Sequence, residues 1–145
     1  IINDKFASLC NVFKKRRYQK VTAFFEFYGP NSFCGMHTEN DILTCTLIDI
    51  KVYKIGYLHP RDYLEIVEES ECDSAYYHGL HNINHEFIQL VRDSKLENMA
   101  NEGVICKGAP LKKGFQPHMF KIKSYKWLKE LREKCKTEEE FQKLV

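Results

Sequence analysis

An α+β fold, with antiparallel sheets and flanking helices, is the fold class that the 145 residues predict. Two observations lead to it. Segments rich in β-branched and aromatic residues, which are typical of strands, are bounded by turn residues. Between and after them lie segments whose apolar residues recur at helical spacing. Strands and helices mixed in this order favour antiparallel strands with helices packed against them.

The elements can be assigned in chain order. Phe6, Cys10 and Phe13 lie at helical spacing, and Pro60 stands where a first helical residue is favoured. Thr137 with Glu140 forms the capping box of a last short helix. The expected elements are a helix over residues 1–17, strands over 21–29 and 42–53, helices from Pro60 and from near Asn84, strands over 103–106 and 118–124, and helices over 124–135 and after Thr137.

Composition and charge limit the possible classes of protein. The net charge is only +2, but a basic cluster runs from Lys14 to Lys20, and its two open interpretations are a solvated face and a contact with polynucleotide phosphates. No apolar run is long enough to cross a membrane. The six cysteines form no C-x-x-C pair, so we expect reduced thiols in an intracellular, cytoplasmic protein.

Three of the expected strands hold charged residues at positions that the apolar pattern predicts to be buried. Glu26 lies between aromatic residues in FFEFYG, and Asp49 lies among aliphatic residues in LIDI. Lys121 and Lys123 alternate with apolar residues in FKIK. Since residues i and i+2 of a strand lie on one face, the two ammonium groups are expected to point the same way, within reach of one multiply charged anion. An ordinary solvated strand face is the alternative.

The segment EGVICKG places an acid and a lysine on either side of a short apolar strand. Strict alternation would send Glu102 and Lys107 to opposite faces, whereas a distortion at Gly103 would bring both toward one site. A carboxylate here is able to hold Mg²⁺, and a lysine is able to contact phosphate.

Taken in order, FFEFYG, LIDI, EGVICKG and KIK resemble four successive motifs of the covalent nucleotidyltransferases, the superfamily of DNA ligases, RNA ligases and mRNA-capping enzymes. The flanking stretches FFEFYGPNSFCGMH, LIDIKVYKIGYLHPRDYLEIV and KIKSYKWLKELREK are similar to RNA ligases of phage or viral type. The resemblance covers 21–135. It implies that residues 1–145 form a partial nucleotidyltransferase domain of the ATP-grasp-like ligase type, with ATP and Mg²⁺ as cofactors.

The resemblance also implies roles for individual residues. Glu26 matches an acid that acts on the nucleotide ribose or supports the metal site, and Glu102 matches the acid associated with the divalent metal. Lys121 and Lys123 match two catalytic lysines that engage the α-phosphate and help to expel pyrophosphate. Lys107 matches a lysine with a phosphate role.

Two departures from the family pattern stand out. Ile48 occupies the position that usually carries an aromatic residue to stack on adenine, so it would supply only an apolar contact. The family's nucleophile is a lysine in K-x-D-G, and no such motif occurs in the sequence. We therefore expect this chain to lack the N-terminal part of the adenylyltransferase domain, and to be inactive alone in self-adenylylation.

The implied function is an ATP-dependent RNA ligase that joins 5′-phosphate and 3′-hydroxyl ends, with RNA or DNA ends as partners and no membrane. The alternatives are a DNA ligase, an mRNA-capping type of nucleotidyltransferase, and a non-catalytic nucleic-acid-binding remnant of the fold.

Two further clusters are weaker candidates for a functional site. His78, His81 and His85 fit one helical face, but Gly79 and two asparagines favour a loop. Cys34 near His37 lacks an orienting partner for a thiol nucleophile.

Overall fold

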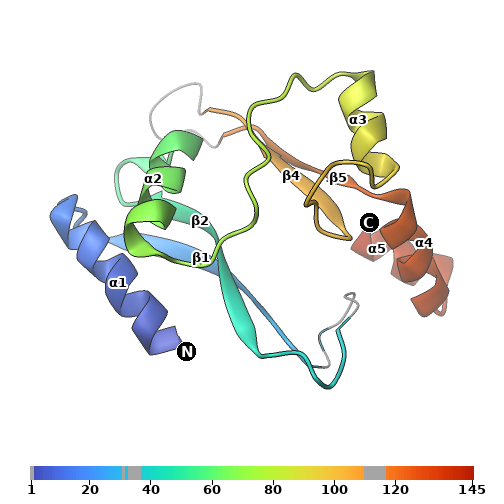
Figure 1. Ribbon diagram of the computed structural model, residues 1–145, viewed down its shortest axis with the longest axis horizontal. Helices are drawn as coiled ribbons and strands as arrows, with labels where there is room; N and C mark the ends of the chain where they lie inside the picture. The colour runs from blue at the N-terminus through green and yellow to red at the C-terminus, as the bar shows by residue number, and fades with distance from the viewer. Residues whose placement is uncertain (1, 31, 33–36, 110–116) are drawn as a thin grey trace. The chain divides into compact units, whose positions relative to one another are not determined.

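The computed structural model describes residues 2–30, 32, 37–109 and 117–145, shown in Figure 1. Helices and small sheets are mixed along the chain, which confirms the predicted α+β class. Contacts divide the chain into two compact units. Unit 1 comprises the described residues of Ile1–Ser32, His37–Ala75 and Lys107–His118, and unit 2 those of Tyr76–Cys106 and Met119–Val145. The single adenylyltransferase domain over 1–145 stays a prediction.

Unit 1 is a three-stranded antiparallel sheet with two helices. The strand order is β1-β2-β3. Helix α2 begins as the sequence predicts, with Pro60 as its first residue and with His59 as its N-cap, whose Nδ1 accepts a hydrogen bond from the Arg61 amide at 3.1 Å. The elements are α1 (Ile2–Lys15), β1 (Val21–Tyr28), β2 (Thr44–Val52), β3 (Gly56–Tyr57) and α2 (Pro60–Ser70).

A β-bulge in β2 determines which residues face the helices. Phe24 pairs with Asp49 and Phe25 pairs with Leu47, so Ile48 is the extra residue between them. Alternation therefore changes phase at this point. Leu47 before the bulge, and Ile50 and Val52 after it, share one buried face, although an uninterrupted strand would separate them.

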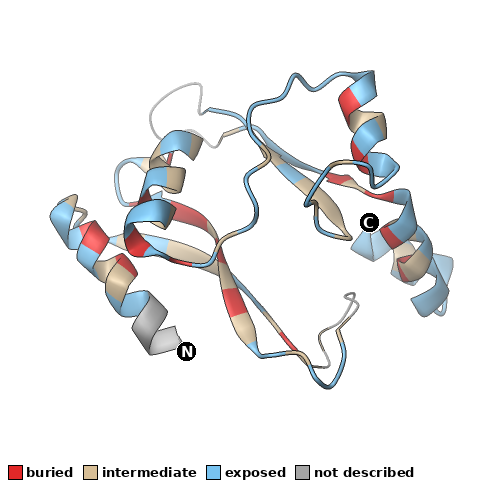
Figure 2. Cartoon of the chain, in the orientation of Figure 1, coloured by how far each residue is buried: buried red, intermediate tan, exposed pale blue. Residues whose placement is uncertain are grey.

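The core of unit 1 lies between this sheet face and the helices. Figure 2 shows the buried residues of α1, α2 and β2 in red. Leu9 of α1, Leu47 and Ile50 of β2 and Ile66 of α2 are fully buried. Burying a side chain of this kind contributes about 1.5–3 kcal/mol, so apolar packing holds the helices on the sheet. The other buried members of this core are Val12, Phe13, Val52, Leu58 and Cys72.

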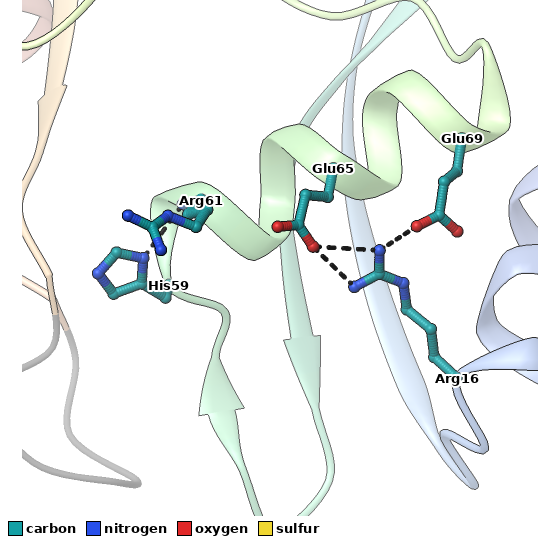
Figure 3. A network of polar contacts seen from close by, with 5 residues as sticks. All are labelled: Arg16, His59, Arg61, Glu65 and Glu69. Atoms are coloured by element: carbon teal, nitrogen blue, oxygen red, sulfur yellow. Dashed lines mark hydrogen bonds and ion pairs between the residues drawn. The ribbon is translucent and has the colours of Figure 1, made fainter.

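Arg16, just after α1, ties that helix to α2. Its guanidinium bonds both Glu65, at 3.4 and 3.5 Å, and Glu69, as Figure 3 shows. Side chains of this exposure contribute only about 0–1 kcal/mol for each pair. Arg16, a member of the basic cluster, thus pairs with acids of the same protein. Lys20, another member, lies after helix α1 and just before β1.

Unit 2 has a two-stranded sheet and three helices. Phe87 and Val91 of α3 pack with Ile122 of β5 in a small core. Asn84 is the N-cap of α3, at the start predicted for this helix, and Ser124 is the N-cap of α4. The elements are α3 (His85–Arg92), β4 (Gly103–Lys107), β5 (Met119–Lys123), α4 (Tyr125–Lys134) and α5 (Glu138–Leu144); Lys107, the last residue of β4, is counted with unit 1.

Helix α5 and the cysteines agree in part with what the sequence predicts. The Thr137 hydroxyl accepts from the Glu140 amide at 3.1 Å, which confirms the predicted cap, but the Glu140 carboxylate reaches back to the Lys136 amide rather than to that of Thr137. Among the described residues, Cys10, Cys45, Cys106 and Cys135 are free thiols, as expected, and Cys34 lies outside these residues. Among the helices of the described residues, none has the length and apolarity needed to cross a membrane.

Candidate functional site

In unit 2, one carboxylate and two ammonium groups lie together. Glu102 Oε1 is 3.2 Å from Lys121 Nζ and 3.8 Å from Lys123 Nζ. Because both lysines reach the same oxygen atom, the prediction that they share one strand face is confirmed. The side chains of Glu102 and Lys121 are 37% and 54% exposed, so solvent and a ligand have access to both.

The local sequence explains this arrangement. Ile122, between the two lysines, is buried in the unit 2 core, so strand alternation directs both lysines to the opposite face. Gly103 lies against β5 with φ of +136°, and a Cβ atom there would be 2.0 Å from the Ile122 carbonyl oxygen. Only glycine fits this close approach, which places the preceding Glu102 beside the two lysines. A distortion at Gly103 is thus present, but the expected meeting of Glu102 with Lys107 is not observed: Glu102 contacts Lys121 and Lys123, and Lys107 pairs with Asp49.

Lys123 is more enclosed than Lys121. Its side chain is 16% exposed, its ammonium group lies 4.4 Å from the ring centroid of Trp127, and it donates a hydrogen bond to the Leu144 carbonyl at 2.9 Å. A cation over an indole ring is a stabilising contact. Lys123 therefore has a structural role in addition to any role in binding an anion.

In unit 1, Lys107 forms an ion pair that the sequence did not predict. Its ammonium group lies 3.1 Å from Asp49 Oδ2, donates to the Ile48 carbonyl and lies 4.9 Å from the ring centroid of Tyr63. The Asp49 residue is 8% exposed. Burial, and secondly the Asp49 charge, raise the pKa of Tyr63, whose hydroxyl donates to the Leu47 carbonyl at 2.6 Å.

Glu26 and Ile48 lie on the same face of the unit 1 sheet, opposite the helices. Glu26 pairs with Thr46, and Ile48 is two residues further along β2. Glu26 is exposed, which corrects the expectation of a buried charge. The reason is alternation along β1: Phe25 packs against the core, so its neighbour Glu26 points to the second face.

The predicted site residues therefore form two groups, each described within its own unit. Glu102, Lys121 and Lys123 are in contact in unit 2, while Glu26, Ile48 and Lys107 belong to unit 1. The contacts of Trp127 with Lys123 and of Tyr63 with Lys107 were not expected from the sequence. A lone aspartate in an aliphatic strand was the available signal for the partner of Lys107, because a buried carboxylate requires a cation.

The donor set of unit 2 suits a metal ion that arrives with a ligand. In the part of the chain that the structure describes, no three or more His, Cys, Asp or Glu side chains gather as a metal site. Mg²⁺ bound with nucleotide phosphates needs only one or two protein carboxylates. Glu102 fits this requirement.

The predicted loop around His78 and His81 is present, and there the His81 ring donates to the His78 carbonyl at 2.7 Å.

Comparisons with models of protein families, with curated proteins and with solved structures found no match for this chain. The fold class and the two residue groups thus define a mixed α+β protein with an exposed carboxylate–lysine cluster. Its function is inferred from the order of the sequence motifs and from this geometry.

Proposed function

We propose that the chain is part of an ATP-dependent polynucleotide ligase that acts on RNA ends. The observation that carries the proposal is the contact of Glu102 with both Lys121 and Lys123 on one accessible strand face. Two ammonium groups so close together favour an anion with several charges, such as the phosphates of ATP. The order of the sequence motifs indicates that this anion is the triphosphate of ATP.

The reaction requires charge neutralisation more than covalent chemistry from these residues. A lysine amine attacks the α-phosphorus of ATP, a P–N bond forms, and the bond to pyrophosphate breaks. The AMP group then passes to a 5′-phosphate, and a 3′-hydroxyl displaces AMP to seal the strand. Lys121 and Lys123 stabilise the negative charge that develops on the α-phosphate and on the leaving pyrophosphate.

Glu102 is the proposed metal ligand. If Mg²⁺ arrived with the nucleotide, the Glu102 carboxylate would hold it there, and the ion would supply charge neutralisation at the phosphates. Without the nucleotide, the Glu102 carboxylate is neutralised by the Lys121 and Lys123 ammonium groups. An incoming phosphate would take over the two lysines and leave the carboxylate to the metal. The same three side chains therefore serve both states.

Unit 1, considered by itself, offers three residues that suit parts of a nucleotide, in the roles that the sequence resemblance implies. Glu26 is exposed and is able to accept a hydrogen bond from a ribose hydroxyl, and Ile48 on the same sheet face offers an apolar contact to adenine. Lys107 uses two of its three N–H donors on Asp49 and the Ile48 carbonyl. One donor is left for a phosphate oxygen.

The test is adenylyl transfer by the natural gene product that carries these residues. Incubation with labelled ATP and Mg²⁺, followed by denaturing electrophoresis and intact mass, should show one AMP on a lysine within K-x-D-G. Glu102→Ala should lower this transfer by about 10²-fold or more. Glu133→Ala, an exposed acid on α4, is the matched control and should not change it.

Three results would contradict parts of the proposal. Transfer by Glu102→Ala within a factor of about two of wild type, at matched Mg²⁺, would remove the metal role. A preference for GTP over ATP would indicate a capping enzyme instead. One AMP mapped to any lysine of residues 1–145 would show that the nucleophile lies in this chain, against the expectation from the missing K-x-D-G motif.

A further inference from the structure

A second cationic surface lies at the other end of the unit 1 sheet from Glu26. A depression of ≈ 380 Å³ is lined by Lys20, Lys51 and Lys54, together with Thr22 and Tyr53. We call it the lysine–tyrosine depression. It is formed where β1 begins and where β2 turns into β3, all within unit 1.

The three lysines bring uncompensated positive charge to this depression. Its described lining contains no Asp or Glu, and none of the three lysines forms a salt bridge with a described residue. Like charges gathered on a strand surface repel each other unless an anion or water meets them. Arg16, by contrast, lies near two glutamates, so its charge is balanced within the protein.

An exposed aromatic ring lies among these cations. Tyr53 is 60% exposed, and its ring centroid is 5.9 Å from Lys20 Nζ and 5.5 Å from Lys54 Nζ. Lys51 Nζ is 5.4 Å from the ring centroid of Tyr57. An exposed tyrosine flanked by lysines offers a ring to a planar group and charges to the phosphates beside that group.

The backbone holds this arrangement in place. The Tyr53 amide donates to the Lys20 carbonyl at 2.9 Å, which joins the turn to the start of β1. Lys54 adopts a left-handed conformation with φ of 65°, although glycine or asparagine would adopt it at lower cost. The turn thus carries a lysine where its own conformation favours another residue type, and the surrounding structure fixes its position.

We propose that the lysine–tyrosine depression binds single-stranded RNA, with Lys20, Lys51 and Lys54 contacting phosphates and Tyr53 stacking on a base. Proteins that bind single strands combine a positive groove with aromatic rings in this way. An acidic protein segment would use the lysines but would leave the tyrosine without a role. This inference rests on the proposed function, because it names where a ligase of RNA ends would hold the strand.

The test uses the 145-residue chain and a fluorescein-labelled oligouridine of about 20 nucleotides, without ATP or Mg²⁺. Fluorescence anisotropy would be measured over a series of salt concentrations. Changing Lys20, Lys51 and Lys54 together to Gln should weaken binding at least tenfold at about 0.1 M salt and lower the salt slope by about 2, since each phosphate contact contributes about 0.7. Tyr53→Ala should weaken binding about tenfold with the slope unchanged.

The matched control changes the exposed Lys95, Lys136 and Lys143 to Gln, which removes the same net charge elsewhere on the surface. This control should bind like wild type, and Tyr53→Trp should retain the binding that Tyr53→Ala loses. Circular dichroism of each variant reports whether the fold is kept.

Two outcomes would overturn the inference. The first is an equal loss of RNA affinity in the two triple-lysine variants. The second is that polyglutamate of similar length competes for the protein as well as RNA does, while Tyr53→Ala has no effect on binding. Binding that depends on the depression, together with no adenylyl transfer by the natural gene product, would retain this inference and remove the proposed function. Adenylyl transfer by the natural gene product, combined with RNA binding that the triple change of Lys20, Lys51 and Lys54 does not weaken, would retain the proposed function and overturn this inference.

Discussion

The ammonium group of Lys107 lies 3.1 Å from a carboxylate oxygen of Asp49, whose side chain is 11% exposed. The other Asp49 oxygen accepts a hydrogen bond from the Ile50 amide at 2.8 Å. The bulge at Ile48 makes this pair possible, because it turns Asp49 away from the face that Leu47 and Ile50 share. A residue that sequence analysis assigned to phosphate binding thus also neutralises a buried charge.

Removing the cation of this pair should destabilise the protein. Lys107→Met leaves the Asp49 carboxylate without its partner, and we expect a loss of about 2–3 kcal/mol in the free energy of unfolding. The double change Asp49→Asn with Lys107→Met should recover most of that loss, because the amide keeps an acceptor for Ile50. Urea denaturation measures both.

The control for this prediction is Lys95→Met. Lys95 lies at a similar distance, 3.2 Å, from Asp93, but its side chain is 69% exposed. Its removal should cost less than about 0.5 kcal/mol, since exposed ion pairs contribute little. Equal losses at the two sites would show that the Lys107 pair is energetically an ordinary surface pair.

Gly103→Ala should disrupt unit 2. The added methyl group would lie 2.0 Å from the Ile122 carbonyl oxygen, and the φ of +136° is unfavourable for any side chain. We expect a loss of several kcal/mol, seen as a large decrease in thermal midpoint by circular dichroism. Gly79→Ala is the control: its φ is +91° but no atom lies within 4 Å, so it should cost about 1 kcal/mol. Similar midpoints for the two variants would contradict the close approach of β4 and β5.

Tyr63→Phe should alter how stability depends on alkaline pH. Burial and the Asp49 charge raise the pKa of Tyr63, so the folded state holds this proton more tightly than the unfolded state. Its contribution is complete below the unfolded pKa near 10 and is lost as the pH rises above it. Wild type should therefore lose more stability between about pH 8 and pH 11 than Tyr63→Phe does.

The same variant loses the hydrogen bond to the Leu47 carbonyl, so at about pH 8 it should be less stable by roughly 1 kcal/mol. Urea midpoints at the two pH values measure both effects, and the exposed Tyr53→Phe is expected to follow wild type. Parallel losses in wild type and Tyr63→Phe would show that Tyr63 titrates alike in the folded and unfolded states.

The sequence predicted the main elements well because each has a local cause. Pro60 and Asn84 mark helix starts through backbone chemistry that acts within a few residues. The bulge at Ile48 is different, since it depends on pairing with Phe24 and Phe25, about 20 residues away in the chain. Alternation alone could not locate the change of phase in β2, so the partner of Asp49 was missed.

Only part of the carboxylate–lysine cluster was predictable from the local sequence. Lys121 and Lys123 flank one buried residue, so alternation placed both on one strand face. The contact of Glu102 with these lysines depends on the pairing of β4 with β5 and was not predicted. The contacts of Lys123 with Trp127 and Leu144 were not predictable, because they depend on how α4 and α5 pack after the strand.

Those contacts lead to different expectations for the two lysines. Lys121→Ala should lower adenylyl transfer by the natural gene product about 10²- to 10³-fold. It should change the free energy of unfolding by less than about 0.5 kcal/mol, because the Lys121 side chain is 54% exposed. Lys123→Ala should lower transfer similarly but also cost about 1 kcal/mol or more, since it removes a cation over Trp127 and a donor to Leu144.

Labelled-ATP assays and urea denaturation of the same preparations separate these effects. Lys123→Arg should retain most of the stability, because a guanidinium also lies well over an indole ring, and Lys129→Ala on the exposed side of α4 should change neither measurement. Full transfer activity in Lys121→Ala would contradict the phosphate assignment and leave that strand face as a solvated surface. A stability loss in Lys121→Ala as large as that in Lys123→Ala would show that the Glu102 ion pair, rather than the Trp127 contact, stabilises β5.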